Sequence, residues 1–143
     1  MTQIPFRITN IQVEKFEQSA VGFTPENPVE VRTGYEFGVN KDLHLVNCRL
    51  TYFYIQDGNH LLEMVLACTF DVKPDAFAEL IKDDGTFVLE PFFSQYLATI
   101  NVGAARGEIH ARCEAVGSPL QNVILPPINL MEALPEPIVI KFQ

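Results

Sequence analysis

Residues 29–40 read Val29-Glu30-Val31-Arg32-Thr33-Gly34-Tyr35-Glu36-Phe37-Gly38-Val39-Asn40, and apolar or β-branched residues occupy every second position up to Val39. A period of two predicts a β-strand with one buried face and one exposed face. Two further strand-like runs follow at 43–56 and 61–72. Short polar stretches, Asn40-Lys41-Asp42 and Asp57-Gly58-Asn59, separate the three runs. Connections this short predict antiparallel hairpins.

The two later strands differ in their patterns. The run at 61–72 alternates, with Leu62, Met64, Leu66, Cys68 and Phe70 on one face. The run at 43–56 carries apolar residues on both faces: Leu43, Leu45, Phe53 and Ile55 on one, and Val46, Cys48, Leu50, Tyr52 and Tyr54 on the other. Helices on one side of a sheet bury only one of these faces. We therefore expect the second face to meet another subunit or a ligand, the alternative being a local loop.

The N-terminal run Phe6 to Phe16 predicts a strand that precedes the other three. Its alternation slips at Thr9-Asn10, which predicts a bulge or bend. Residues 17–28 form a longer connection, with Gly22, Pro25 and Pro28 as breakers and Phe23 expected to be exposed within it.

The second half of the chain predicts helices. Pro74 opens a short helix through Ile81, and Pro91 opens a long one that runs to Ala115, before Gly117-Ser118-Pro119 ends it. One stripe of the long helix, at spacings of three and four, comprises Phe92, Tyr96, Ile100, Gly103, Gly107 and Ala111. Glycine inside a helix costs about 1 kcal/mol relative to alanine. Two glycines on one stripe indicate close approach of another backbone, either the sheet of the same chain or the same helix of a second subunit.

The residues after the long helix read Leu120-Gln121-Asn122-Val123-Ile124-Leu125-Pro126-Pro127-Ile128-Asn129-Leu130. Two prolines exclude both a helix and a central strand, so we expect an extended apolar segment along the body of the protein. Residues 137–143 predict a short final strand. The 143 residues therefore predict one α+β domain, spanning 1–143, with a four-stranded antiparallel sheet packed against a long helix.

Composition narrows the class of function. The formal charge is −8 and the ten basic residues are scattered, which argues against a nucleic-acid partner. The sequence contains no run of 18 apolar residues, so we expect no membrane-spanning helix. The N-terminus does not resemble a secretory signal. Cys48, Cys68 and Cys113 are widely spaced, which predicts buried thiols in a reducing, cytoplasmic compartment rather than disulfides or a zinc site.

No arrangement of residues predicts catalysis. The chain lacks the motifs of nucleotide-binding loops, serine hydrolases and zinc proteases. His44, His60 and His110 are scattered over different elements, and Glu108 and Arg112 have the spacing of a helical ion pair. We expect no cofactor, no metal and no enzymatic activity.

The order of motifs at the long helix resembles the SecB family of protein-export chaperones. The similar stretches are Ala105-Arg106-Gly107-Glu108-Ile109, then Gly117-Ser118-Pro119-Leu120, then Leu125-Pro126-Pro127-Ile128-Asn129-Leu130. Phe6-x-Ile8, Ile11 and Phe16 resemble the opening of that family. The resemblance covers about residues 5 to 134.

This resemblance implies a chaperone that holds unfolded or precursor polypeptides in extended form without ATP. It also implies a dimer of dimers with the long helices at the interface, which points to Tyr96, Ile100, Gly103, Gly107 and Ala111 as interface candidates. The client grooves of the family involve the first connection and the segment after the main helix. The corresponding client-binding candidates are Phe16, Phe23, Leu125, Ile128 and Leu130, for which core packing is the alternative.

Two departures from the family concern docking on the SecA translocation motor. SecB ends in a second helix and a polar tail, whereas this chain has Pro135 and Pro137 there. SecB also carries an acid after the cysteine of the fourth strand, where this chain has Thr69. Docking on SecA is therefore in doubt. A holdase for other clients, like the toxin–antitoxin chaperones of SecB type, stays open. Two competing hypotheses are an oligomeric scaffold or dedicated partner- or ligand-binding protein on the same fold, and an enzyme with a dispersed site.

Overall fold

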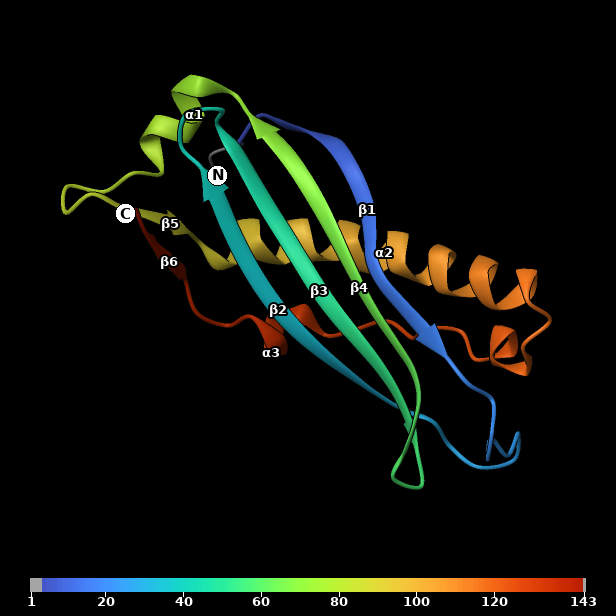
Figure 1. Cartoon of the computed structure of the whole chain (residues 1–143). Coiled ribbons are helices and arrows are strands. Elements are labelled where there is room, and N and C mark those ends of the chain that lie inside the picture. The colour runs from blue at the N-terminus through green and yellow to red at the C-terminus, as the bar shows by residue number, and fades with distance from the viewer. Residues whose placement is uncertain (1–3, 143) are drawn as a thin grey trace.

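The computed structural model describes residues 4–142 and contains one main sheet, one long helix and a small second sheet (Figure 1). The main sheet comprises β1 (Phe6–Gln18), β2 (Glu30–Asn40), β3 (Leu45–Gln56) and β4 (Asn59–Val72). The order across the sheet is β1-β4-β3-β2, and every neighbouring pair is antiparallel. The predicted α+β architecture is confirmed, and β1 and β2 are the two edge strands.

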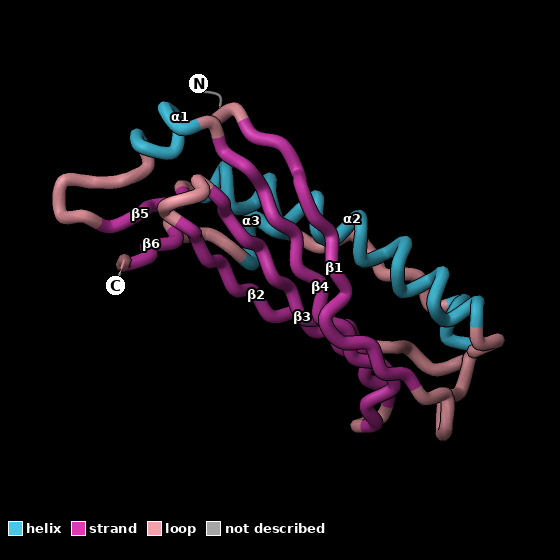
Figure 2. The backbone as a smooth tube through the Cα atoms, turned by 45° about the horizontal axis from the view of Figure 1, so that its top comes forward, coloured by secondary structure: helices cyan, strands magenta, loops and turns pink. Residues whose placement is uncertain are grey.

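The long helix α2 (Pro91–Ala115) covers one face of the sheet and has the predicted bounds. Proline at its first turn fits a position that needs no N–H donor. Gly117 follows the helix at φ +68, a left-handed conformation that glycine adopts without strain. Figure 2 shows α2 as a second layer running diagonally behind the strands.

The core lies between α2 and the inner face of the sheet. The central strands β3 and β4 supply its fully buried residues, among them Val46, Cys48, Leu50, Tyr52, Tyr54, Met64, Leu66, Cys68 and Phe70. The alternation predicted for β4 is therefore confirmed, and of the two apolar faces predicted for β3 the one from Val46 to Tyr54 is the inner face. All three cysteines are buried free thiols.

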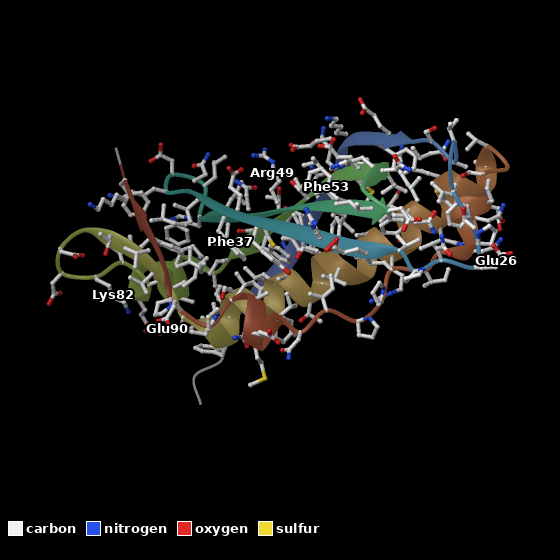
Figure 3. All side chains as sticks on the ribbon, turned by 90° about the horizontal axis from the view of Figure 1, so that it is seen from below. Glu26, Phe37, Arg49, Phe53, Lys82 and Glu90 are labelled. Atoms are coloured by element: carbon white, nitrogen blue, oxygen red, sulfur yellow. The ribbon has the colours of Figure 1, made fainter. Side chains whose placement is uncertain are left out.

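The outer face of β3, which was predicted to meet another subunit or a ligand unless a local loop covers it, is apolar only toward its ends. Its centre is polar, with Asn47, Arg49 and Thr51, and Leu43 lies outside the strand. A register shift between Tyr54 and Ile55 leaves Ile55 only 6% exposed. Figure 3 shows Arg49 and Phe53 on the side of the sheet away from α2. The centre of this face is therefore polar, and its cover by a partner stays a prediction.

β1 is irregular and β2 is regular. The β1–β4 register shifts between Ile8 and Asn10, as the sequence predicted, and again between Val13 and Lys15. The β2–β3 register runs from Glu30 to Asn40 without a shift. Bulges bend a strand and interrupt its hydrogen-bonding edge, so the two edges of the sheet differ in kind.

A small second sheet contains a strand that the sequence analysis missed. β5 (Thr86–Leu89) pairs with β6 (Ile138–Lys141), the predicted C-terminal strand. The first helix, α1 (Pro74–Glu79), is shorter than predicted because Ile81 forms a bridge with Phe87 instead. The remaining elements after α2 are the 3-10 helix η1 (Pro119–Asn122) and the one-turn helix α3 (Leu130–Ala133).

Candidate functional site

The connection between β1 and β2 is held against the end of the sheet. Gln56, 1% exposed, accepts a hydrogen bond from Thr24 N at 2.8 Å and donates to Thr24 O at 2.8 Å and Asn27 O at 2.9 Å. Ser19 N donates to Leu61 O at 2.8 Å where the connection begins. The connection is therefore an ordered part of the surface, although it has no regular secondary structure.

A tight turn at residues 20–23 sets the direction of Phe23. Phe23 N donates to Ala20 O at 3.0 Å, and Gly22 has φ +82, a conformation that side chains rarely adopt. Val21, at the tip of this turn, is 86% exposed. The predicted exposure of Phe23 is corrected, because its side chain is half-buried and packs on the core.

The segment after α2 runs back along the helix, as an extended segment was predicted to do. His110 Nδ1 lies 2.9 Å from Gln121 O, and Gln95 donates to Leu134 O at 2.9 Å. Arg106 donates to Leu125 O at 2.6 Å and to Pro126 O at 3.2 Å. These contacts pair the two segments in opposite directions, and backbone carbonyls of the returning segment, which lies in no strand here, bond side chains of the helix.

The connection and the returning segment are both bonded to inner-facing side chains at one end of β3. Tyr54, fully buried, is the cross-strand partner of Val31, and its hydroxyl donates to Val123 O at 3.2 Å. Gln56, two residues further on, binds Thr24 beside Phe23. We call the set Phe23, Val31, Val123 and Ile124 the apolar shelf. The first three are half-buried and Ile124 is 53% exposed.

The structure separates the five client-binding candidates. Phe23 belongs to the apolar shelf, and the half-buried Ile128 lies further along the same returning segment. Leu125 and Leu130, at 1% and 8% exposure, are core residues and present no side-chain surface in this conformation. Phe16 lies on β1, at the opposite edge of the sheet from β2, with the guanidinium of Arg112 5.7 Å from its ring centre.

The stripe of α2 faces away from the sheet. Tyr96 is 59% exposed, and a side chain added at Gly103 or Gly107 would meet nothing within 4 Å. The sheet of the same chain is therefore not what the two glycines approach, and close approach of a second subunit stays a prediction. Phe6 connects this stripe to β1, since its ring lies 5.5 Å from Phe93 and 5.6 Å from Tyr96.

The inner face of β1 extends the exposed apolar area beside the stripe. Ile8 and Ile11 are cross-strand partners of the core residues Phe70 and Cys68, yet they remain 40% and 49% exposed. Ile8 and Ile11 face the same side of the sheet as the core. Their exposure therefore shows that α2 does not cover this part of the sheet completely. Together with the stripe of α2 they form the second apolar surface of the chain, which we call the assembly face after its proposed role.

The outer face of the sheet is hydrophilic. Arg49 forms ion pairs of 2.6 Å with both Glu14 on β1 and Glu36 on β2, which together raise the pKa of its guanidinium. A shallow hollow of about 430 Å³ surrounds Arg49. Its lining includes Asn47 and Thr69, whose hydroxyl donates to the Asn47 amide oxygen at 3.0 Å.

The cysteine thiols of the described residues are buried, and burial raises their pKa values. Burial raises the pKa of the Cys68 thiol to about 11 and raises that of Cys48 further, while Cys113 shifts in the same direction. Such thiols stay protonated and unreactive near neutral pH. Within residues 4–142, no cluster of three or more His, Cys, Asp or Glu has a metal-binding arrangement. None of the described helices is both long and apolar enough to cross a membrane.

The comparisons with known proteins identify the fold. No protein-family model matches the chain, and no curated protein sequence does. Among solved structures, the chain is similar to the Mycobacterium tuberculosis Rv1957 SecB-like chaperone, solved in complex with a ChAD peptide from the Rv1956 HigA1 antitoxin. The TM-score is 0.53 at 9% sequence identity, over 87% of this chain and 86% of that chain. The chain therefore has a SecB-like fold.

Sequence reasoning missed Gln56 and Arg106 as the residues that fix the two segments. Gln56 continues the inner-facing alternation of Tyr52 and Tyr54, so a polar residue at a core position was the available signal. Arg106 lies within a motif that was noted for its resemblance alone. Its side-chain bonds to Leu125 and Pro126 give that motif a physical role.

Proposed function

We propose that this protein is an ATP-independent holdase that binds unfolded or precursor polypeptides in extended form. The observation that carries the proposal is the apolar shelf, where residues from two distant segments leave apolar surface partly open on a SecB-like fold. Apolar contact is non-directional, so such a surface accepts many sequences. Binding and release need no chemistry, no cofactor and no catalytic residue.

The position of β2 at the edge of the main sheet supports the extended form of the client. Its backbone lies at the end of the strand order and pairs regularly with β3 over 11 residues. An extended polypeptide can add to such an edge through main-chain hydrogen bonds, which do not depend on sequence. The inner-facing side chains of the added strand would then lie beside Val31, at the apolar shelf.

A dedicated partner is the second candidate. The neighbour Rv1957 was solved with one peptide from an antitoxin, and a single peptide partner would use the same surfaces. On this alternative the chain is an oligomeric scaffold or partner-binding protein without general client binding. The two candidates differ in breadth, since only a holdase protects unrelated unfolded proteins.

The proposal includes assembly and location. We propose that the assembly face joins two copies of the chain as a homodimer or, through further contacts, a homotetramer in the cytoplasm. We do not propose docking on the SecA motor. Thr69 stands where the family has an acid, and its hydroxyl bonds Asn47 within the same face.

The test is aggregation of chemically denatured luciferase on dilution into buffer without nucleotide, followed by light scattering. A stoichiometric excess of this protein is expected to suppress scattering, while an equal mass of an unrelated folded acidic protein is not. The measurement is repeated with two further unfolded proteins. Protection of all three supports the holdase. Protection of none, with this protein folded by circular dichroism, overturns general client binding in favour of the dedicated partner.

A further inference from the structure

Gln56 is a polar residue at a core position. Tyr52, Tyr54 and Gln56 alternate along β3 and face the same side of the sheet, and all three are buried. A buried amide carries a desolvation penalty of about 1 to 3 kcal/mol unless its hydrogen bonds are made. An apolar side chain of similar size would fill this position without that penalty, so the amide calls for a specific explanation.

The bonds of Gln56 all reach the connection between β1 and β2. Both its N–H groups donate to backbone carbonyls, those of Thr24 and Asn27, and its oxygen accepts from Thr24 N. The side chain therefore pairs with the N–H and C=O of Thr24 as a neighbouring strand residue would. It supplies the partners that residues 20–29 lack because they join no strand.

Few other bonds tie this connection to the sheet. In the part of the chain that the structure describes, the remaining link between residues 20–29 and the sheet is the exposed bond from Asn27 Nδ2 to Asp57 Oδ2 at 3.1 Å. The bonds Phe23 N to Ala20 O and Asn27 N to Thr24 O are internal to the connection. Gln56 thus holds the connection at Thr24 and at Asn27, on both sides of the middle of residues 20–29.

We infer that Gln56 is a positioning residue for polypeptide binding, which acts by holding Phe23 in the apolar shelf before a client arrives. This inference rests on the proposed function. A preformed apolar surface binds more tightly than one that must first be ordered, because the ordering entropy is already lost. The client residues that contact Phe23 are large apolar side chains of an extended polypeptide segment.

The experiment measures the affinity of the full-length protein for a permanently unfolded client. The probe is fluorescently labelled, reduced and carboxymethylated α-lactalbumin, and binding is followed by anisotropy. The variants are Gln56→Met, which keeps length and loses the hydrogen bonds, Phe23→Ala, and the double variant. Asn101→Ala is the matched control, since it removes a buried amide that bonds β3 and β4 and makes no contact with the connection.

Amide hydrogen exchange at Thr24 accompanies the affinities. Gln56→Met is expected to speed exchange there, while Asn101→Ala leaves that site protected in the folded protein. Gln56→Met and Phe23→Ala are each expected to weaken binding about tenfold. The double variant is expected to be no weaker than the weaker single variant, because residues that act through one another are not additive.

Two results overturn the inference alone. The first is that the wild-type protein binds the client and that the Gln56→Met variant, shown to be folded, binds it with the same affinity. The other is a double variant whose loss is the product of the two single losses, which would mean that Gln56 acts independently of Phe23. Wild-type protein that binds no unfolded client overturns the proposed function itself, and this inference with it.

Discussion

The phenolic hydroxyl of Tyr52 on β3 donates a hydrogen bond of 2.7 Å to Oδ1 of Asn101 on α2. The amide nitrogen of Asn101 donates in turn to Cys48 O at 3.0 Å and Leu66 O at 2.9 Å. Both side chains are fully buried, so one residue of the helix is bonded to two strands. This network fixes the rotation of α2, and therefore which stripe of the helix faces outward.

Replacing Asn101 by leucine is expected to lower the free energy of unfolding by about 2 kcal/mol, because the Tyr52 hydroxyl loses its buried acceptor. Urea unfolding followed by circular dichroism measures the change. Tyr52→Phe in the Asn101→Leu background should recover part of the loss, since it removes the orphaned hydroxyl. Thr99→Ala, exposed on the same helix, is the control. An unchanged stability of Asn101→Leu would refute the role of this network.

Gly107 tests the assembly face through a matched pair of substitutions. Gly107→Ala and Gly107→Leu both remove a helix glycine next to open space, so both should raise the stability of the folded chain by about 1 kcal/mol. Only the leucine side chain blocks close approach of a second helix. Static light scattering is expected to give the wild-type mass for the alanine variant and a smaller mass for the leucine variant. Equal masses for the two variants would place the interface elsewhere.

Ile124 tests the apolar shelf without disturbing the core. It is 53% exposed, so Ile124→Ser should change stability by less than about 0.5 kcal/mol and still weaken the suppression of luciferase aggregation. Val139→Ser is the control, because Val139 is 56% exposed on β6, outside the shelf. If both serine variants protect luciferase as well as wild type does, the client surface does not include Ile124.

Cys68 predicts a loss of stability at alkaline pH. Its pKa is raised by burial from 9.0 to about 11, so the folded state keeps a proton that the unfolded state releases. The stability linked to this proton is fully present below pH 9 and falls as pH rises toward 11. The urea midpoint is expected to be lower at pH 10.5 than at pH 8. A midpoint that does not move would contradict the burial of this thiol.

The long helix and the four strands could be predicted from the sequence because their signals are local. Pro91 and Gly117 mark the two ends of α2, and alternation marks the strands. β5 was missed because its four residues pair with Ile138–Lys141, about fifty positions later, so no local pattern reveals the partner. The polar centre of the outer face of β3, around Arg49, was overlooked because the apolar residues at the two ends of that face outweighed it.

The candidate site could be predicted only as far as the segments that contribute to it. The connection after β1 and the segment after α2 are both bonded to side chains at one end of β3. Which of their residues stay open depends on what the fold places over them. Leu125 is buried and Ile124 is open, although the two are adjacent and equally apolar. Gln56 decides the course of the connection, and a single polar residue in an apolar strand gives no hint of its partner.

The contrast between the two sheet edges bears on how the protein avoids associating with itself. A regular strand edge invites any other strand, including the same edge of a second folded copy. β2 carries Glu30, Arg32 and Glu36 on its outer side, and all three side chains are exposed. Two copies that pair edge to edge with Glu30 opposite Glu36 would bring like charges close together, whereas an unfolded chain without charge at these positions meets no such repulsion. These charges therefore disfavour one register of self-association and leave the backbone of the edge available to a client.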